Sequence, residues 1–116
     1  MENKDFLGLD VPYLTNAYIR QKDKEDIKIV CANLLRFAWD KGLLLNNPFN
    51  EEGELILTTC VYENDVTELG RQIFSDLCYK WITYTDNLTG KIDRKNNIKM
   101  LEKYYNQLIQ QLEIKQ

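Results

Sequence analysis

The side chains in this sequence that could carry chemistry are mainly carboxylates, because the chain has no histidine and only three cysteines. The lack of histidine excludes Ser-His-Asp and Cys-His catalysis and removes imidazole as a metal ligand. Cys31, Cys60 and Cys78 are widely spaced and form no C-x-x-C pair, so we expect neither a disulfide framework nor a structural zinc site. Cys31 and Cys78 fall within predicted helices, where we expect buried thiols that behave as small apolar groups.

Carboxylates gather in the middle of the chain. Between Gly42 and Gly70 there are six acidic residues and no lysine or arginine. They are Glu51, Glu52, Glu54, Glu63, Asp65 and Glu68. Such oxygens suit a hard cation, but an EF-hand also needs alternating acids, a central glycine and a glutamate at the twelfth loop position, and that register is absent. There is also no P-loop, G-x-G-x-x-G or G-x-S-x-G motif. We therefore expect no enzyme, no cofactor and no metal.

Basic residues gather elsewhere, within a formal net charge of −3. From residue 87 onward there are six of them against three acids. The bland interpretation is that both regions are solvated faces. A functional interpretation is that the acidic segment attracts a basic protein, since complementary charge speeds association. The alternative is a nucleic-acid site on the basic helix, carried by Lys91, Arg94, Lys95, Lys99 and Lys103. Acids are interspersed in that helix and the whole chain is acidic, so direct nucleic-acid binding is the less expected of the two.

Six residues are the candidates for contact with a partner. Four are chosen for local charge alone: Glu51, Glu52, Glu54 and Glu63. Tyr62 and Trp39 are added as aromatic anchors, because aromatic side chains are favoured where an amphipathic group is half buried at an interface. Trp39 is off the densest apolar stripe of its predicted helix, which favours partial exposure.

The segment from Asp65 to Asp86 is the element around which the rest of the chain is expected to fold. Its apolar residues recur at steps of three and four, which places them on one face of a helix. They are Val66, Leu69, Ile73, Leu77, Trp81 and Tyr84. Asp65, with Glu68 three residues later, has the spacing of an N-terminal capping box. Such a helix would span about 30 Å, the width of a small domain.

Three further helices are predicted. One covers 24–41 and ends at Gly42, which is placed to adopt a left-handed conformation. Its apolar face consists of Ile27, Val30, Cys31, Leu34, Leu35, Phe37 and Ala38. A short helix opens at Asp10 and runs to Gln21, and a last helix follows Asp93 and packs antiparallel to the Asp65–Asp86 segment. The face of the last helix is marked by Ile98, Leu101, Tyr105, Leu108 and Leu112.

The predicted fold is mainly α, a bundle of three to four helices in a single helical domain, residues 1–116. A small β-hairpin between the second and third helices is a further option, in which Leu43–Leu45 would pair with Leu55–Cys60 around turn residues. No apolar run reaches the ~20 residues that span a bilayer, and the N-terminus lacks the pattern of a secretory signal. We therefore expect a cytoplasmic protein without a membrane partner.

Three stretches also suggest a family. NDVTELGRQIF, KWITYTD and KNNIKMLEKYYNQL, within about residues 55–112, resemble small bacterial immunity proteins of toxin–immunity systems, particularly those of contact-dependent growth inhibition. The resemblance implies that the protein binds a cognate toxin domain in the cytoplasm and blocks its active site. Such toxins are frequently nucleases with basic clefts, in which an acidic surface would take the place of nucleic acid. Contacts differ among family members, so the resemblance transfers no binding residue.

Overall fold

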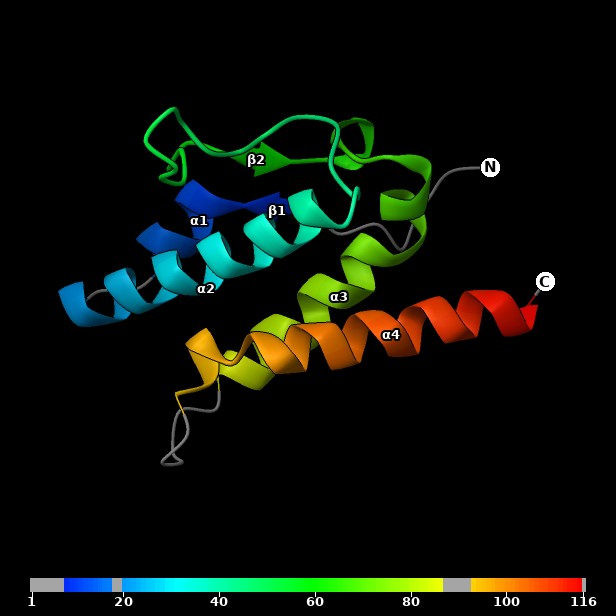
Figure 1. Cartoon of the computed structure of the whole chain (residues 1–116). Coiled ribbons are helices and arrows are strands. Elements are labelled where there is room, and N and C mark those ends of the chain that lie inside the picture. Colours follow the sequence, from blue (N-terminus) through cyan, green and yellow to red (C-terminus); the bar gives the residue numbers. More distant parts are fainter. Residues whose placement is uncertain (1–7, 18–19, 87–92, 116) are drawn as a thin grey trace.

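Two long helices that meet at a buried tryptophan organise the molecule. The computed structural model describes residues 8–17, 20–86 and 93–115. The described elements, in chain order, are β1 (Leu9–Asp10), α1 (Val11–Asn16), α2 (Gln21–Asp40), β2 (Cys60–Val61), η1 (Glu63–Asp65), α3 (Glu68–Asp86), η2 (Arg94–Asn96) and α4 (Ile98–Lys115). The mainly helical fold predicted from the sequence is confirmed (Figure 1). None of the helices in the described ranges combines the length and the apolar character that crossing a membrane requires.

The core lies where α2 and α3 face each other. Trp81 of α3 has no exposed surface, and its indole N–H donates to the Val30 carbonyl of α2 over 3.0 Å. All seven residues predicted for the inner face of the 24–41 helix are buried, and so are Ile73 and Leu77 of α3. The apolar periodicity of both helices was therefore interpreted correctly, although α2 begins at Gln21 rather than at residue 24.

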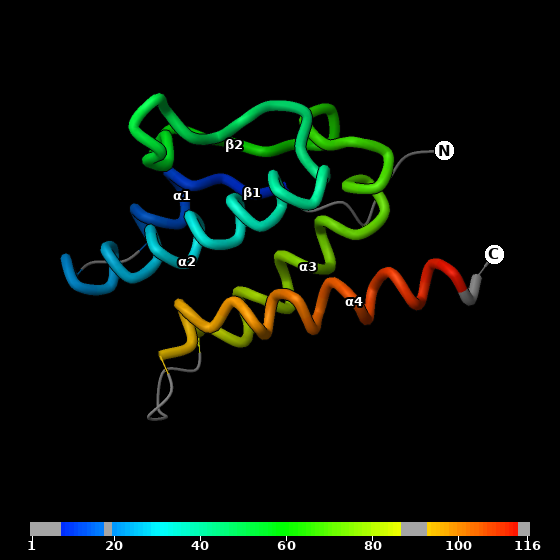
Figure 2. The backbone as a smooth tube through the Cα atoms, in the orientation of Figure 1, coloured from blue at the N-terminus to red at the C-terminus, as the bar shows by residue number. Residues whose placement is uncertain are grey.

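The last helix packs along α3 and closes the other side of the core. Figure 2 shows that α4 runs in the opposite direction to α3, as predicted for a helical hairpin. Leu101 and Leu108 of α4 are buried. The rings of Tyr84 and Tyr104 meet edge to face with centroids 6.2 Å apart, which joins the two helices near the end of α3.

Residues 41–67 form an irregular layer that lies over α2 (Figure 1). A two-stranded antiparallel sheet is present, but its strands are β1 and β2, with Leu9 opposite Val61. The predicted pairing of Leu43–Leu45 with Leu55–Cys60 is wrong, since Leu44 instead bridges Val66 and Leu55 bridges Phe49. The N-terminal segment supplies the buried apolar Leu9 as a partner for β2, which ties the long connection to the start of the chain.

The helix ends differ from the predicted caps in two places. Thr67 rather than Asp65 caps the N-terminus of α3. The Thr67 hydroxyl oxygen accepts the Gly70 N–H over 3.0 Å. The Asp65 carboxylate instead accepts the Tyr62 N–H and so caps the start of η1. Asp93 does not cap α4 either, because η2 intervenes and the Asp93 carboxylate accepts hydrogen bonds from side chains of η2.

Two other predicted helix ends are confirmed. The Asp10 carboxylate accepts the Tyr13 N–H over 3.0 Å and opens α1, although α1 ends at Asn16 rather than at Gln21. Gly42 follows α2 with φ at +74°, the left-handed conformation that glycine adopts without strain.

We predict that Trp81→Ala lowers the free energy of unfolding by about 3–5 kcal/mol, because it removes a fully buried ring and leaves a cavity at the α2–α3 contact. Chemical denaturation monitored by circular dichroism measures this. Trp39→Ala is the matched control: that residue is 38% exposed, and we expect a clearly smaller cost than for the fully buried Trp81. Equal costs for the two variants would contradict the assignment of Trp81 to the core.

We also predict that Gly70→Ala destabilises the protein. In an isolated helix the opposite is expected, because the helix propensity of alanine is about 1 kcal/mol more favourable than that of glycine. A methyl group at Gly70 would overlap the Leu43 carbonyl oxygen, which the irregular layer brings against the first turn of α3. Thermal denaturation of Gly70→Ala is compared with Thr83→Ala, an exposed helical control. A higher melting temperature for Gly70→Ala would show that the close approach is absent.

Candidate functional site

The strongest candidate for a binding site is a turn of the irregular layer at residues 50–54, which we call the acidic loop. The Asn50 side-chain oxygen accepts the backbone N–H groups of Glu52 and Glu54, over 3.0 and 2.9 Å. The Asn50 N–H in turn donates to the Glu54 carbonyl, and Gly53 has φ at +79°. The backbone of the acidic loop is therefore fixed by its own hydrogen bonds.

An arginine on α2 anchors the acidic loop to the helical core. The Arg36 Nη2 group donates to the Gly53 carbonyl over 2.9 Å. The Arg36 guanidinium also lies 4.3 Å from the centroid of the Phe49 ring, and that ring is buried. A cation is attracted to the face of an aromatic ring. Arg36 therefore holds Phe49, which precedes the acidic loop, and Gly53, which lies within it, against α2.

The glutamates that were predicted to bind a partner fall into two groups. Glu51, Glu52 and Glu54 are exposed on the acidic loop, and within residues 8–17, 20–86 and 93–115 none of them takes part in an ion pair. Glu63 belongs to η1, where it pairs with Arg71 of α3 at 3.2 Å. Part of the Glu63 charge is thus already compensated within the molecule.

The predicted aromatic anchors are exposed, but the structure does not place them on the acidic loop. Tyr62 is 55% exposed and Trp39 is 38% exposed. Tyr62 directly precedes η1, and Trp39 lies in the last turn of α2. In Figure 1 the segment around η1 and the acidic loop lie at opposite ends of the layer, with β2 between them. The six predicted residues are therefore divided between the layer and the last turn of α2 rather than gathered in one patch.

Sequence reasoning missed the exposed apolar residues beside the acidic loop. Ile56 and Leu57 follow it and are 42% and 46% exposed, and Ile29 of α2 is 36% exposed. The run Leu55–Leu57 was interpreted as part of a strand, in which alternate residues would be buried. In the structure this run lies beside residues of α2, which are far away in the sequence. Periodicity within the run therefore could not indicate that Ile56 and Leu57 are exposed there.

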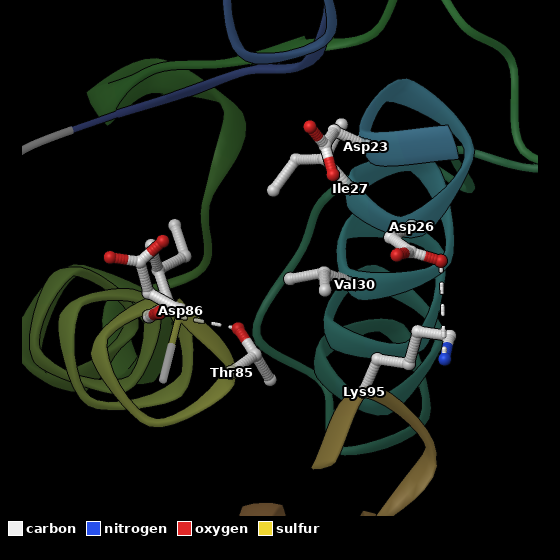
Figure 3. A pocket seen from close by; sticks show the side chains of 8 residues that line it. Asp23, Asp26, Ile27, Val30, Thr85, Asp86 and Lys95 are labelled. Carbon is white, nitrogen blue, oxygen red and sulfur yellow. Dashed lines mark hydrogen bonds and ion pairs between the residues drawn. The ribbon is translucent and has the colours of Figure 1, made fainter. Parts of the chain in front are cut away.

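A separate small pocket lies between the first half of α2 and the end of α3 (Figure 3). Asp23, Asp26, Asp86 and Lys95 line its rim, and the Lys95 ammonium lies 3.9 Å from the Asp26 carboxylate. Its volume of about 50 Å³ has room for a few water molecules but is far below the size of a metabolite site. Within the described residues, no group of three or more acidic or cysteine side chains is arranged to hold a metal ion.

Two residues of the predicted basic face are used by the fold. The Arg94 Nη1 group donates to the Tyr84 carbonyl over 3.1 Å, and its guanidinium stacks 4.9 Å from the Tyr84 ring centroid. Lys95 pairs with Asp93 at 2.9 Å. Lys99 and Lys103 are exposed on α4, whereas Lys91 lies outside the described residues.

The thiols in the core fit the structural role expected of them. Burial raises the pKa of Cys31 to about 12, and burial with the nearby Cys31 raises the pKa of Cys78 well above its usual value. A thiol must lose its proton to act as a nucleophile, and burial disfavours that step for both residues. Cys60, at the start of β2, is half buried.

Comparison with known proteins gives no assignment: no protein-family model matches the chain, and neither a curated protein nor a solved structure is significantly similar to it.

The contact between η2 and Asp93 predicts a pH effect. The Asn96 amide and then the Lys95 ammonium hold the pKa of Asp93 below its ordinary value. Because that pKa is lower in the folded than in the unfolded state, ionised Asp93 stabilises the fold above its unfolded pKa. This contribution is lost as the pH falls through the folded-state pKa. We expect Asn96→Ala to raise the pKa of Asp93, measured by an NMR titration of its carboxyl carbon.

Asn106→Ala, at an exposed position of α4, serves as the control for this titration. It should leave the pKa of Asp93 where it is in the unchanged protein. If Asn96→Ala also leaves that pKa unchanged, the amide of Asn96 does not stabilise the carboxylate.

Proposed function

We propose that this protein is a stoichiometric inhibitor of a toxin domain and that it binds a basic surface of the toxin through the acidic loop. One observation supports this most strongly. Glu51, Glu52 and Glu54 are exposed on a turn whose backbone is fixed, and no described residue forms an ion pair with them. The class of partner rests on the resemblance to immunity proteins of contact-dependent growth inhibition.

Uncompensated charge on a fixed turn suits recognition of a basic protein. Exposed carboxylates attract a basic partner over about a Debye length, roughly 8 Å at physiological ionic strength, and so raise the association rate. A loop that is ordered before binding loses little conformational freedom in the complex. Asn50 and Arg36 supply that order here.

We assign the other predicted contacts to the edge of the same interface. Glu63 already pairs with Arg71, so a partner would gain less from it than from the acidic loop. Tyr62 beside η1 and Trp39 in the last turn of α2 offer exposed aromatic surface away from the acidic loop. In the proposed complex the toxin domain therefore extends from the acidic loop past η1.

Inhibition of this kind needs no catalytic group and no cofactor, because the inhibitor acts by occupying the toxin's active-site cleft. In the proposed role it works in the cytoplasm, where it would protect the producing cell and its siblings. The nucleic-acid alternative is less well supported, since Arg94 and Lys95 are held in contacts within the fold.

We predict that Glu51→Lys, Glu52→Lys and Glu54→Lys together slow association with the cognate toxin domain at least tenfold at low salt, because attraction becomes repulsion. The toxin domain to test is to be sought in the neighbouring genes, as the variable C-terminal domain of a large exoprotein. Surface plasmon resonance at several salt concentrations measures the association rate. The difference should shrink as salt rises, since ions screen exposed charges.

The control is a second triple reversal, Glu68→Lys, Asp76→Lys and Glu113→Lys, which changes the net charge equally at exposed positions of α3 and α4. It should leave most of the association rate intact. Equal slowing by both triple variants would indicate a nonspecific charge effect. Loss of function on substitution of Lys99 and Lys103, with the acidic-loop variant unaffected, would favour nucleic acid instead.

A further inference from the structure

Beside the acidic loop, α2 and residues 54–57 enclose a shallow groove of about 380 Å³. Its lining residues are Lys28, Ile29 and Ala32 from α2, and Asn50, Glu54, Leu55 and Leu57 from the layer. We propose that this groove, which we call the α2–loop groove, receives an apolar side chain of the partner that is flanked by a lysine or arginine. The proposal deepens the proposed function and rests on it for the identity of the partner.

The apolar surface of the groove comes from both walls. Ile29 is 36% exposed and Leu57 is 46% exposed, while Ala32 and Leu55, which also line the groove, are half buried. Exposed apolar residues that adjoin one another and are rimmed by polar groups are typical of interaction sites. The volume also falls within the range of concave sites that bind ligands, about 300–1,000 Å³.

The wall formed by the layer is held in place before any partner arrives. The Ile56 N–H donates to the Pro48 carbonyl over 2.9 Å, and Leu55 bridges Phe49. Arg36 then fixes Gly53 and the Phe49 ring to α2. The groove is therefore a feature of the folded protein, and a partner does not have to order it.

The charged residues that line the groove determine which segment fits. Glu54 is one of them, on the same turn as Glu51 and Glu52, so this wall attracts a cation. Lys28 lies among the α2 residues that line the groove, where its ammonium can pair with an oxygen of the partner. The occupant is thus a protein segment with an apolar side chain in the middle and a basic residue beside it, which a basic toxin surface can provide.

The two features have different roles in binding. The glutamates act at a distance and mainly set how fast the partner arrives. An apolar side chain buried in the groove would act only at contact, and so would mainly set how slowly the complex dissociates. Substitutions in the groove and in the acidic loop should therefore change different rate constants.

The groove can be tested without the toxin. The probe is the peptide acetyl-Lys-Leu-Leu-Lys-amide, titrated into the ¹⁵N-labelled full-length protein while amide shifts are recorded by NMR. We expect the largest shifts at Ile29, Ala32, Leu55 and Leu57. The peptide acetyl-Lys-Ser-Ser-Lys-amide, which has the same charge, should shift these amides much less.

Leu57→Ser removes apolar surface from one wall of the groove, and less apolar burial means weaker binding. We expect the dissociation constant for the leucine peptide to rise roughly tenfold. Leu45→Ser is the matched control, since Leu45 is 55% exposed in the same layer but does not line the groove. Both leucines are exposed, so we expect both variants to fold, and circular dichroism verifies this.

Three results would overturn the proposal. The first is that the leucine peptide shifts amides elsewhere, for example around Gly8 and Tyr79. The second is that Leu57→Ser and Leu45→Ser bind it equally well. The third is that the groove amides shift with protein concentration alone, which would make a second copy of this chain the occupant.

The outcomes for the groove and for the proposed function are separable. A peptide that binds the groove while the toxin domain does not bind would leave the groove intact and refute the inhibitor role. A toxin domain whose dissociation rate is unchanged by Leu57→Ser, but whose association slows on reversal of the acidic loop, would retain the inhibitor role and refute the groove as its anchor.

Discussion

The burial of Trp81 against α2 is the contact on which the rest of the structure depends. A fully buried indole has to satisfy its N–H group, and Trp81 does so on the Val30 carbonyl of the neighbouring helix. That hydrogen bond joins α3 to α2 in the middle of the apolar core. With these two helices placed, α4 can close one side of the core, and the irregular layer can lie over α2.

The irregular layer is ordered by local polar contacts and only partly by a sheet. Its two ends are tied to the helices through Thr67, whose hydroxyl donates to the Gly42 carbonyl over 2.7 Å, and through Arg36. Each of these residues satisfies a backbone group that irregular structure would leave unpaired. The Arg36 contact also holds the acidic loop in place, so it serves both the packing of the layer and the presentation of its charge.

Charge in this molecule is divided between groups that are used by the fold and groups that are left free. Arg94, Lys95 and Glu63 all contact partners within the chain. Glu51, Glu52 and Glu54 pair with no described residue, and they stand beside exposed apolar side chains. The proposed interface is built on the second group, because the charges of the first group are already compensated within the fold.

The sequence by itself determined the helices, because the apolar residues of α2 and α3 recur with the period of a helix and that period is local. It also indicated the acidic stretch and the absence of histidine chemistry. The hydroxyl contact that joins Thr67 to Gly42, the partner of β2 and the groove beside Leu57 were decided only by the tertiary structure. Each depends on residues far apart in the chain: Thr67 with Gly42, Leu9 with Val61, and Ile29 with Leu57. Local periodicity contains no information about such pairs, since it describes the face of one element and not the element that covers it.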